Sequence, residues 1–157
     1  MKAAEKLAQI QKRIEQQLSR NKDLDFLLKE IPEQIQKRTR LGRGVNESGA
    51  IYKFDPLSEK YIDRRKKSSL DPYTKPTRSN LTFTGQMLRS IEGVRRGTLF
   101  IFTLGGLRSD GKSNSDLAKW NEEKGRRFFD LSNSERLGLS RQISKILTKS
   151  IKKLFDN

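Results

Sequence analysis

The sequence predicts an α+β fold: a small antiparallel sheet packed by helices, with an N-terminal helical extension and a long central loop. Three observations predict it. Apolar residues recur at helical spacing near both ends of the chain, residues 98–104 form an apolar β-prone run, and residues 41–80 keep neither period. We therefore divide the chain into an N-terminal helical segment (1–40), an extended partner-binding loop (41–80) and an α+β core with a C-terminal amphipathic helix (81–157).

The N-terminal segment carries a narrow apolar stripe. Its members follow one another at steps of three and four: Ala3, Leu7, Ile10, Ile14 and Leu18. This spacing indicates a helix that pairs with one neighbour, either in its own domain or in another subunit. A second helical stretch follows, for which Asp23 is a plausible N-cap, and Pro32 either kinks it or starts a fresh turn.

The central segment differs in composition. Three of the four prolines lie between residues 41 and 80, among several glycines and scattered aromatic residues. The same segment carries the basic cluster Arg64, Arg65, Lys66 and Lys67. The interleaved aromatic residues favour a loop that becomes ordered on a partner. The alternative is a solvated linker with a run of charges.

The third segment holds the expected sheet. A short helix is expected over residues 81–91, with Thr82 or Thr84 as its N-cap. Residues 98–104 are the expected central strand, and Val94 with its neighbours is the candidate partner strand in a hairpin.

Two helical patterns complete the third segment. One covers residues 115–124 and ends at Gly125, and the other is capped by Asn133 or Ser134. The apolar face of this last helix contains Leu139, Ile143, Ile146, Leu147, Ile151 and Leu154. Its opposite face is basic: Arg141, Lys145, Lys149 and Lys152. Such a stripe is either a solvated outer face or a contact with DNA or an acidic subunit.

Composition restricts the chemistry. The chain has 157 residues, no cysteine and no histidine, which removes disulfides, thiolate nucleophiles, imidazole bases and the usual zinc ligands. We therefore expect no enzyme, no cofactor and no metal site. There is no apolar run of about 20 residues and no signal-peptide pattern, so we expect no membrane association and action under cytosol-like conditions.

The charge of the chain is strongly positive but evenly spread. The formal net charge is +15, and no stretch stands out as a basic arm. Clustered Lys and Arg would indicate a grip on phosphates. An even excess fits a protein that works beside polyanions at least as well.

Two short motifs have catalytic alternatives. Residues 106–113 match the phosphate-loop pattern G-x-x-x-x-G-K-[ST], but the following residues lack the apolar face that would anchor a helix on a sheet, which favours a plain turn. Asp110 with the acidic pair at 122–123 and Lys124 loosely matches a magnesium-dependent nuclease. That site needs its acidic pair on a strand, whereas we expect a helix there.

Three segments carry a resemblance when taken in order. They are Phe54-x-Pro56-Leu57-x-x-x-Tyr61, then Leu81-Thr82-x-Thr84-Gly85-x-x-Leu88-x-Ser90-Ile91, then Leu117-Ala118-x-Trp120-Asn121-x-x-x-Gly125-Arg126-Arg127-Phe128-Phe129-x-Leu131-Ser132. This set resembles the tail-completion, or virion-morphogenesis, proteins of tailed bacteriophages over roughly residues 40–150.

The resemblance implies a non-enzymatic structural subunit of the virion. Such a subunit is assembled in the host cytoplasm and joins the neck at the head–tail junction, or the tail end. The implied partners are copies of itself in a ring or other homo-oligomer, and neck or tail proteins such as a tail terminator or connector, with genomic DNA nearby.

The candidate partner-binding residues come from the basic cluster at 64–67 and from the last of the three stretches that carry the phage resemblance. Phe128 or Phe129 would anchor the chain on the sheet or simply pack in the core. The candidates for partner binding are Arg64, Arg65, Lys66, Lys67, Trp120, Arg126 and Arg127. The alternative function is a basic DNA- or RNA-binding module that uses the cluster at 64–67 and the basic face of the last helix.

Overall fold

The fold is α+β and elongated. The computed structural model describes residues 3–68, 75–81, 85–108 and 110–155. The helices are α1 (Ala3–Arg20), the 3-10 helix η1 (Lys22–Phe26), α2 (Leu27–Arg40), α3 (Glu59–Lys66), α4 (Gln86–Arg89), α5 (Asn114–Glu123) and α6 (Asn133–Phe155). The strands form two antiparallel hairpins: β1 (Arg43–Val45) with β2 (Ile51–Lys53), and β3 (Ile91–Arg96) with β4 (Leu99–Leu104).

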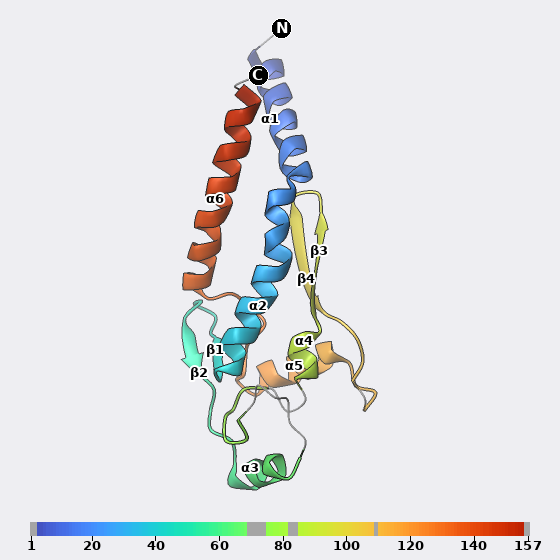
Figure 1. Ribbon diagram of the computed structural model, residues 1–157, viewed down its shortest axis with the longest axis vertical. Coiled ribbons are helices and arrows are strands. Elements are labelled where there is room, and N and C mark those ends of the chain that lie inside the picture. Colours follow the sequence, from blue (N-terminus) through green and yellow to red (C-terminus); the bar gives the residue numbers. More distant parts are fainter. Residues whose placement is uncertain (1–2, 69–74, 82–84, 109, 156–157) are drawn as a thin grey trace.

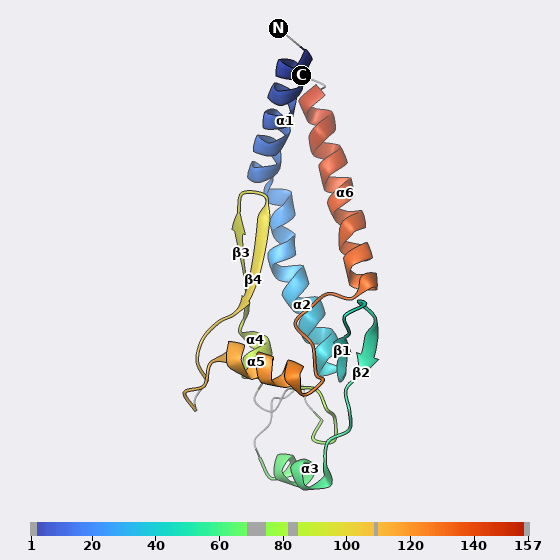
Figure 2. The same ribbon diagram turned by 180° about the vertical axis from the view of Figure 1, so that it is seen from behind.

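The long helices set the shape. Helices α1, η1 and α2 follow one another along the long axis, and α6 returns beside them, so that both chain ends lie at the same end of the molecule (Figure 1). Helix α3 lies at the opposite end. Seen from behind, the β1–β2 hairpin lies next to the start of α6 (Figure 2), where the Asn133 N–H donates to the carbonyl oxygen of Gly49 at 2.9 Å.

The joint between α1 and α2 corrects one sequence prediction. The N-cap of η1 is Asn21, whose side-chain oxygen accepts a hydrogen bond from the N–H of Asp23, so Asp23 is not the cap. Asn21 takes an extended backbone conformation, which leaves its short side chain free to reach forward to the first turn. Pro32 lies inside α2, which continues to Arg40, so it does not start a fresh turn.

The central segment is not the unstructured loop that we predicted. It contains the β1–β2 hairpin and the eight-residue helix α3. Asn46 closes the hairpin, because its side-chain oxygen accepts from the N–H of Ala50, and Gly49 adopts a left-handed φ of 81°. The strands are three residues long, too short for an alternating pattern to stand out in the sequence.

The β3–β4 hairpin confirms the predicted pairing. Val94 lies opposite Ile101, and Gly97 (φ 63°) lies in the turn. Residues 98–104 are not a central strand, because β4 has one partner strand in a two-stranded sheet. Helices take the remaining places: α2 contacts β3, and α5 contacts β4. The residues of β4 are exposed or half-buried, so this strand is apolar on both faces without being buried inside a sheet.

The hydrophobic core draws on all three predicted segments. Its buried members are Ile35, Phe54, Met87, Leu88, Ile91, Ala118 and Phe128. Phe128 is 1% exposed and Leu88 is fully buried. The core is therefore not confined to residues 81–157, and Phe128 is a core residue, one of the two roles considered for it.

Helix ends follow local capping chemistry. Gly85 (φ 67°) precedes α4, and the predicted caps Thr82 and Thr84 lie outside the described residues. Gly125 (φ 72°) follows α5, as predicted. The predicted caps of α6, Asn133 and Ser134, are wrong by one or two residues.

Helix α6 is capped by Ser132 instead. The Ser132 hydroxyl accepts from the N–H of Glu135 at 3.3 Å, and the Glu135 carboxylate accepts from the N–H of Ser132 at 2.7 Å. This is a capping box, in which two helix-terminal donors are satisfied reciprocally. Along α6, Leu139 is buried, whereas Ile143, Ile146, Leu147 and Ile151 are half-buried; the side chain of Leu154 lies outside the described residues.

Candidate functional site: an arginine-lined pocket

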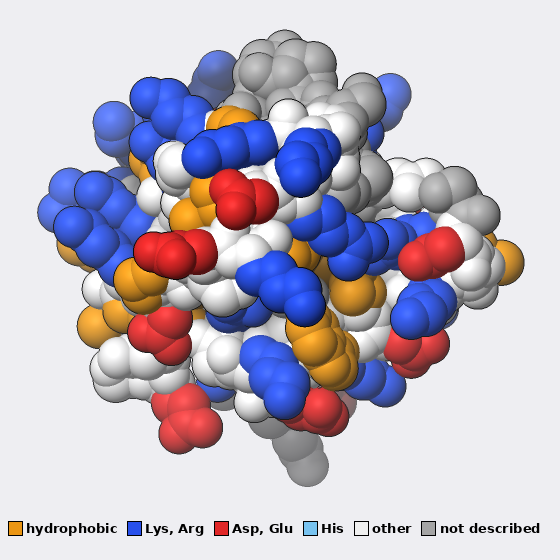
Figure 3. Space-filling model, turned by 90° about the horizontal axis from the view of Figure 1, so that it is seen from below, with side chains coloured by type: hydrophobic (Ala, Val, Ile, Leu, Met, Phe, Trp, Pro, Cys, Tyr) orange, Lys and Arg blue, Asp and Glu red, His pale blue; other side chains and the backbone are white. Residues whose placement is uncertain are grey.

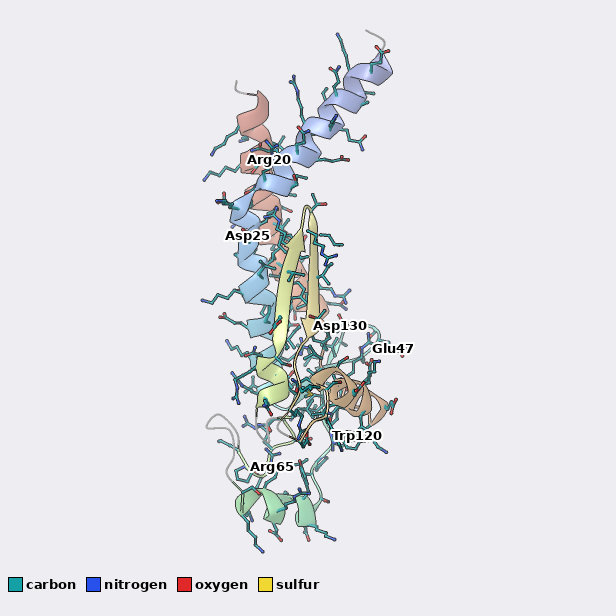
Figure 4. The ribbon with its side chains drawn as sticks, turned by 90° about the vertical axis from the view of Figure 1, so that its right-hand side faces the viewer. Arg20, Asp25, Glu47, Arg65, Trp120 and Asp130 are labelled. Atoms are coloured by element: carbon teal, nitrogen blue, oxygen red, sulfur yellow. The ribbon has the colours of Figure 1, made fainter. Side chains whose placement is uncertain are left out.

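A pocket of about 350 Å³ lies between α3, α4, α5 and the segment that precedes α4. Its lining includes three arginines, Arg65, Arg108 and Arg126, and we call it the arginine pocket. Figure 4 labels Arg65 beside α3 and Trp120 on α5. The apolar part of the lining includes Leu57, Leu81, Met87 and Leu117, and the polar part includes Asn80 and Asn121.

Arg65 lies in the last turn of α3 and is 2% exposed. Its guanidinium donates to the carbonyl oxygen of Arg78 at 2.8 Å and to the side-chain oxygen of Asn80 at 3.1 Å. It also lies 5.9 Å from the centre of the Tyr61 ring. Burial lowers the pKa of the Arg65 guanidinium, and the charge interaction with Tyr61 opposes this. On the side of α3, the pocket is therefore lined by the Arg65 guanidinium, which is desolvated and fixed in place by hydrogen bonds.

Hydrogen bonds to the backbone on both sides of Arg126 fix the position of this residue. The Tyr52 hydroxyl donates to the carbonyl oxygen of Gly125 at 2.7 Å and accepts from the N–H of Arg127 at 2.9 Å. The N–H of Arg126 donates to the carbonyl oxygen of Asn121 at 2.8 Å. Its Nε atom is buried and has no hydrogen-bond partner among the described residues. A rigid backbone thus presents this side chain to the pocket.

Arg108 enters from the turn between β4 and α5. It forms an ion pair with Asp110 at 3.2 Å, and its Nε atom is buried without a described hydrogen-bond partner. Three cations from distant parts of the chain thus line one cavity. Guanidinium groups recognise carboxylate and phosphate oxygens through paired hydrogen bonds. The pocket is therefore suited to an anionic group attached to an apolar portion.

The rim of the pocket is aromatic. Trp120 is 50% exposed and Tyr61 is 37% exposed, although both are large rings. Exposed tryptophan and tyrosine beside arginine are typical of energetically important positions in protein interfaces. The rim thus adds a contact surface to the charged interior.

The structure unites some predicted site residues and separates others. Arg65, Trp120 and Arg126 meet at the arginine pocket. Arg64 and Lys66 are exposed on α3, because successive residues of a helix point in different directions, and Lys67 is exposed just after the helix. Arg127 lies outside the lining and pairs with Asp130 at 3.0 Å and with Glu122 at 3.5 Å.

The basic face of α6 is a separate surface. Lys145, Lys149 and Lys152 line an open groove with Ser144 and Thr148. Arg141 is exposed one turn earlier. At the other end of the molecule, around α3, lysines and arginines are interspersed with acidic side chains (Figure 3).

The residues of the phosphate-loop match form a closed turn. The N–H of Arg108 donates to the carbonyl oxygen of Lys112 at 2.8 Å, and the N–H of Gly111 donates to the carbonyl oxygen of Arg108 at 3.0 Å. Ser113 is the N-cap of α5, and its hydroxyl accepts from the N–H of Asp116. The acidic residues of the nuclease alternative lie on α5 and in this turn rather than on a strand.

Two residues that the sequence analysis did not single out complete the pocket. Asn80 is fully buried and orients Arg65, and Arg108 adds a third cation. Arg108 lies within the phosphate-loop match, which was the available signal. For Asn80 the sequence carries no signal, since its partner Arg65 is 15 positions away.

Neither a cluster of metal-ligating side chains nor a helix long and apolar enough to span a bilayer occurs in the described ranges. Comparisons with protein-family models, curated proteins and solved structures found no match to this chain.

Proposed function

We propose that this chain is a non-enzymatic structural subunit of a tailed-phage virion, of the tail-completion or neck type. It assembles at the head–tail junction or the tail end, with copies of itself and with other neck or tail proteins. The observation that carries the proposal is that the three segments of the phage resemblance, although far apart in the sequence, fold against one another.

The core supports this reading first. Phe54, Leu88 and Phe128 come from the first, second and third segments respectively, and all three belong to one buried cluster. The pocket supports it again, because Tyr61, Gly85 and Trp120, one from each segment, line the same cavity. The three segments thus contribute to one core and one site, and this supports the proposal.

The arginine pocket is the docking site in this proposal. An aspartate or glutamate of a neighbouring subunit enters it and pairs with Arg126 and Arg108, while an adjacent apolar side chain packs on Trp120. Pairing a desolvated carboxylate with guanidinium gives specificity as well as affinity. The positive charge of the chain then serves assembly beside DNA and acidic subunits.

Binding to purified neck and tail-terminator subunits encoded beside this chain tests the proposal, with light scattering to follow complex formation. We expect a complex, and we expect Arg126→Glu to weaken it at least about tenfold. Lys124→Glu is the matched control, because Lys124 is exposed, lies outside the pocket and undergoes the same charge change. A chain that stays monomeric and binds none of these subunits contradicts the proposal.

A second candidate function is a basic DNA- or RNA-binding module. The observation that favours it is the groove on α6, which places Lys145, Lys149 and Lys152 in a row. Electrostatic contact with phosphates predicts a steep loss of affinity as the salt concentration rises. Affinity for a DNA duplex at two salt concentrations, with and without Lys→Glu changes at these three positions, separates the candidates: tight binding lost in the variant favours the nucleic-acid module.

A further inference from the structure

We infer that the exposed apolar seam of α1 docks an acidic amphipathic helix of a partner protein. The inference concerns a different surface from the arginine pocket. It goes beyond the proposed function, because it assigns the chemistry of a second partner contact and holds for any assembly that this chain joins.

The first step is that the seam of α1 lies largely open. The side chain of Leu7 is 67% exposed and that of Ile10 is 42% exposed, whereas Ile14 and Leu18 are half-buried. Figure 4 shows why: α1 leans away from α6 toward its N-terminal end. The N-terminal half of the seam is therefore more exposed than the half that carries Ile14 and Leu18. A lone helix of this length is marginal in water, so a second helix on the seam would stabilise it.

The second step is that the seam has a heptad register. With Leu7 and Ile14 at a positions, Ile10 and Gln17 fall at d. This is the 3,4 spacing of a coiled-coil seam. The surface is thus built for a helix rather than for an extended peptide, which would follow a two-residue period.

The third step is that one flank of the seam is entirely basic. In this register the g positions hold Lys6, Arg13 and Arg20, all exposed. The e positions, on the other flank of the seam, hold Gln11 and Leu18, which carry no charge. Figure 4 labels Arg20 at the end of α1 that meets the body of the molecule. In a coiled coil, the e and g residues select the partner.

The charge pattern argues against a second copy as the occupant. A parallel pair of α1 helices would place the g cations against uncharged e residues, so that no ion pair forms. An antiparallel pair would place Arg13 against Arg13 and Lys6 against Arg20, which repel one another. A helix with acidic residues along its flanking positions pairs with all three cations, so the occupant is an acidic helix.

The test uses the full chain and two synthetic helical peptides. Both peptides carry leucine and isoleucine at a and d; one has glutamate at e and g, and the other has lysine there. Fluorescence anisotropy of the labelled peptides measures binding. We expect the acidic peptide to bind at least tenfold more tightly than the basic one, and this preference to shrink at high salt.

Two adjacent residues provide a matched pair of variants. Arg13→Glu changes a g position and should weaken the acidic peptide at least fivefold, whereas Lys12→Glu, on the outer face, should leave its affinity within twofold. The double change Leu7→Asp and Ile10→Asp should abolish binding. Circular dichroism establishes that helix content is retained, and the comparison of Arg13 with Lys12 holds even if the double variant loses helix.

Three outcomes would overturn the inference. They are equal affinity for the two peptides, equal effects of the Arg13 and Lys12 changes, and a dimer of the full chain in light scattering that Leu7→Asp dissociates. The last outcome would assign the seam to a second copy. Because no neck or tail protein enters this experiment, its result is independent of the proposed function.

Discussion

Buried arginines occur in two regions of this protein, and the groups that neutralise their charge differ between the two regions. Arg38, at the end of α2, pairs with the carboxylate of Glu135 and donates to the carbonyl oxygens of Phe128 at 2.6 Å and Asp130 at 2.7 Å. We call this group the Arg38 clamp. In the arginine pocket, Arg126 has no ion pair with a described residue, and its Nε atom is buried without a partner.

The difference concerns where the neutralising groups come from. Within the Arg38 clamp, Glu135 also accepts from the backbone and hydroxyl of Ser132, and Asp130 pairs with Arg127 and Arg136. The clamp therefore ties α2, the segment before α6 and the α6 cap together from within the chain. In the arginine pocket, Arg108 pairs with Asp110 at 3.2 Å, and Arg65 donates to the backbone and to an amide side chain. Arg126 lacks such neutralisation within the described residues.

The largest expected effect comes from breaking the Arg38 clamp. Arg38→Met should lower the free energy of unfolding by about 3–5 kcal/mol, because it leaves the Glu135 carboxylate and two carbonyl oxygens without their donor. Urea denaturation followed by circular dichroism measures this. Arg43→Met, at an exposed position of β1, is the control and should change stability by about 0.5 kcal/mol or less. A loss below about 1 kcal/mol for Arg38→Met would show that the clamp does not hold the fold.

The next effect compares two aromatic residues eight positions apart. Phe128→Ala should cost about 3 kcal/mol, because it empties a site in the core where the ring is 1% exposed. Trp120→Ala, at the half-exposed rim of the arginine pocket, should cost about 1 kcal/mol or less and weaken partner docking instead. Thermal unfolding and the subunit-binding assay together distinguish these roles. Equal losses of stability would place Trp120 in the core.

The α+β class and most of the helices were predictable from local patterns. The period of apolar residues indicated α1, α5 and α6, and the β-prone run with its glycine turn indicated the β3–β4 hairpin. The helix caps were less accurate. Ser132 and Glu135 match the capping-box spacing, but the two neighbouring polar residues Asn133 and Ser134 offer competing caps, and only the fold decides among them.

The site was predictable only in part. The basic cluster at 64–67 singled out Arg65, and the phage resemblance singled out Trp120 and Arg126. Neither indicated that Arg65 points inward while its neighbours point to solvent. Arg38 was not singled out, because nothing in the sequence distinguishes it from the neighbouring cations Lys37 and Arg40, and its partner Glu135 lies 97 positions away. Tertiary contacts decide both cases.

Lowering the pH should weaken the ion pairs of Asp130 in the Arg38 clamp. Burial raises the pKa of the Asp130 carboxyl, but the N–H of Leu131 and the guanidinium groups of Arg136 and Arg127 outweigh it, so that the pKa lies below its ordinary value of 3.8. The charged form thus stabilises the fold at pH values above 3.8, and this contribution is lost as the pH falls toward the lower, folded-state pKa.

Asp130→Asn should remove that pH dependence. As the pH falls through 3.8 and below, the unaltered chain should lose more stability than the variant, since all other carboxyls are common to both. Urea denaturation at a series of pH values measures the difference. Parallel curves for the two chains would mean that the Asp130 pairs add nothing to the clamp.

The smallest expected effect on stability is that of changing Arg126 in the arginine pocket. Arg126→Met should change the free energy of unfolding by about 0.5 kcal/mol or less, because no ion pair within the described residues is broken and the methionine retains the apolar stem. The variant should nonetheless lose partner docking. A loss of stability approaching that of Arg38→Met would mean that Arg126 supports the fold from within, and the contrast between a self-neutralised clamp and a partner-facing pocket would no longer hold.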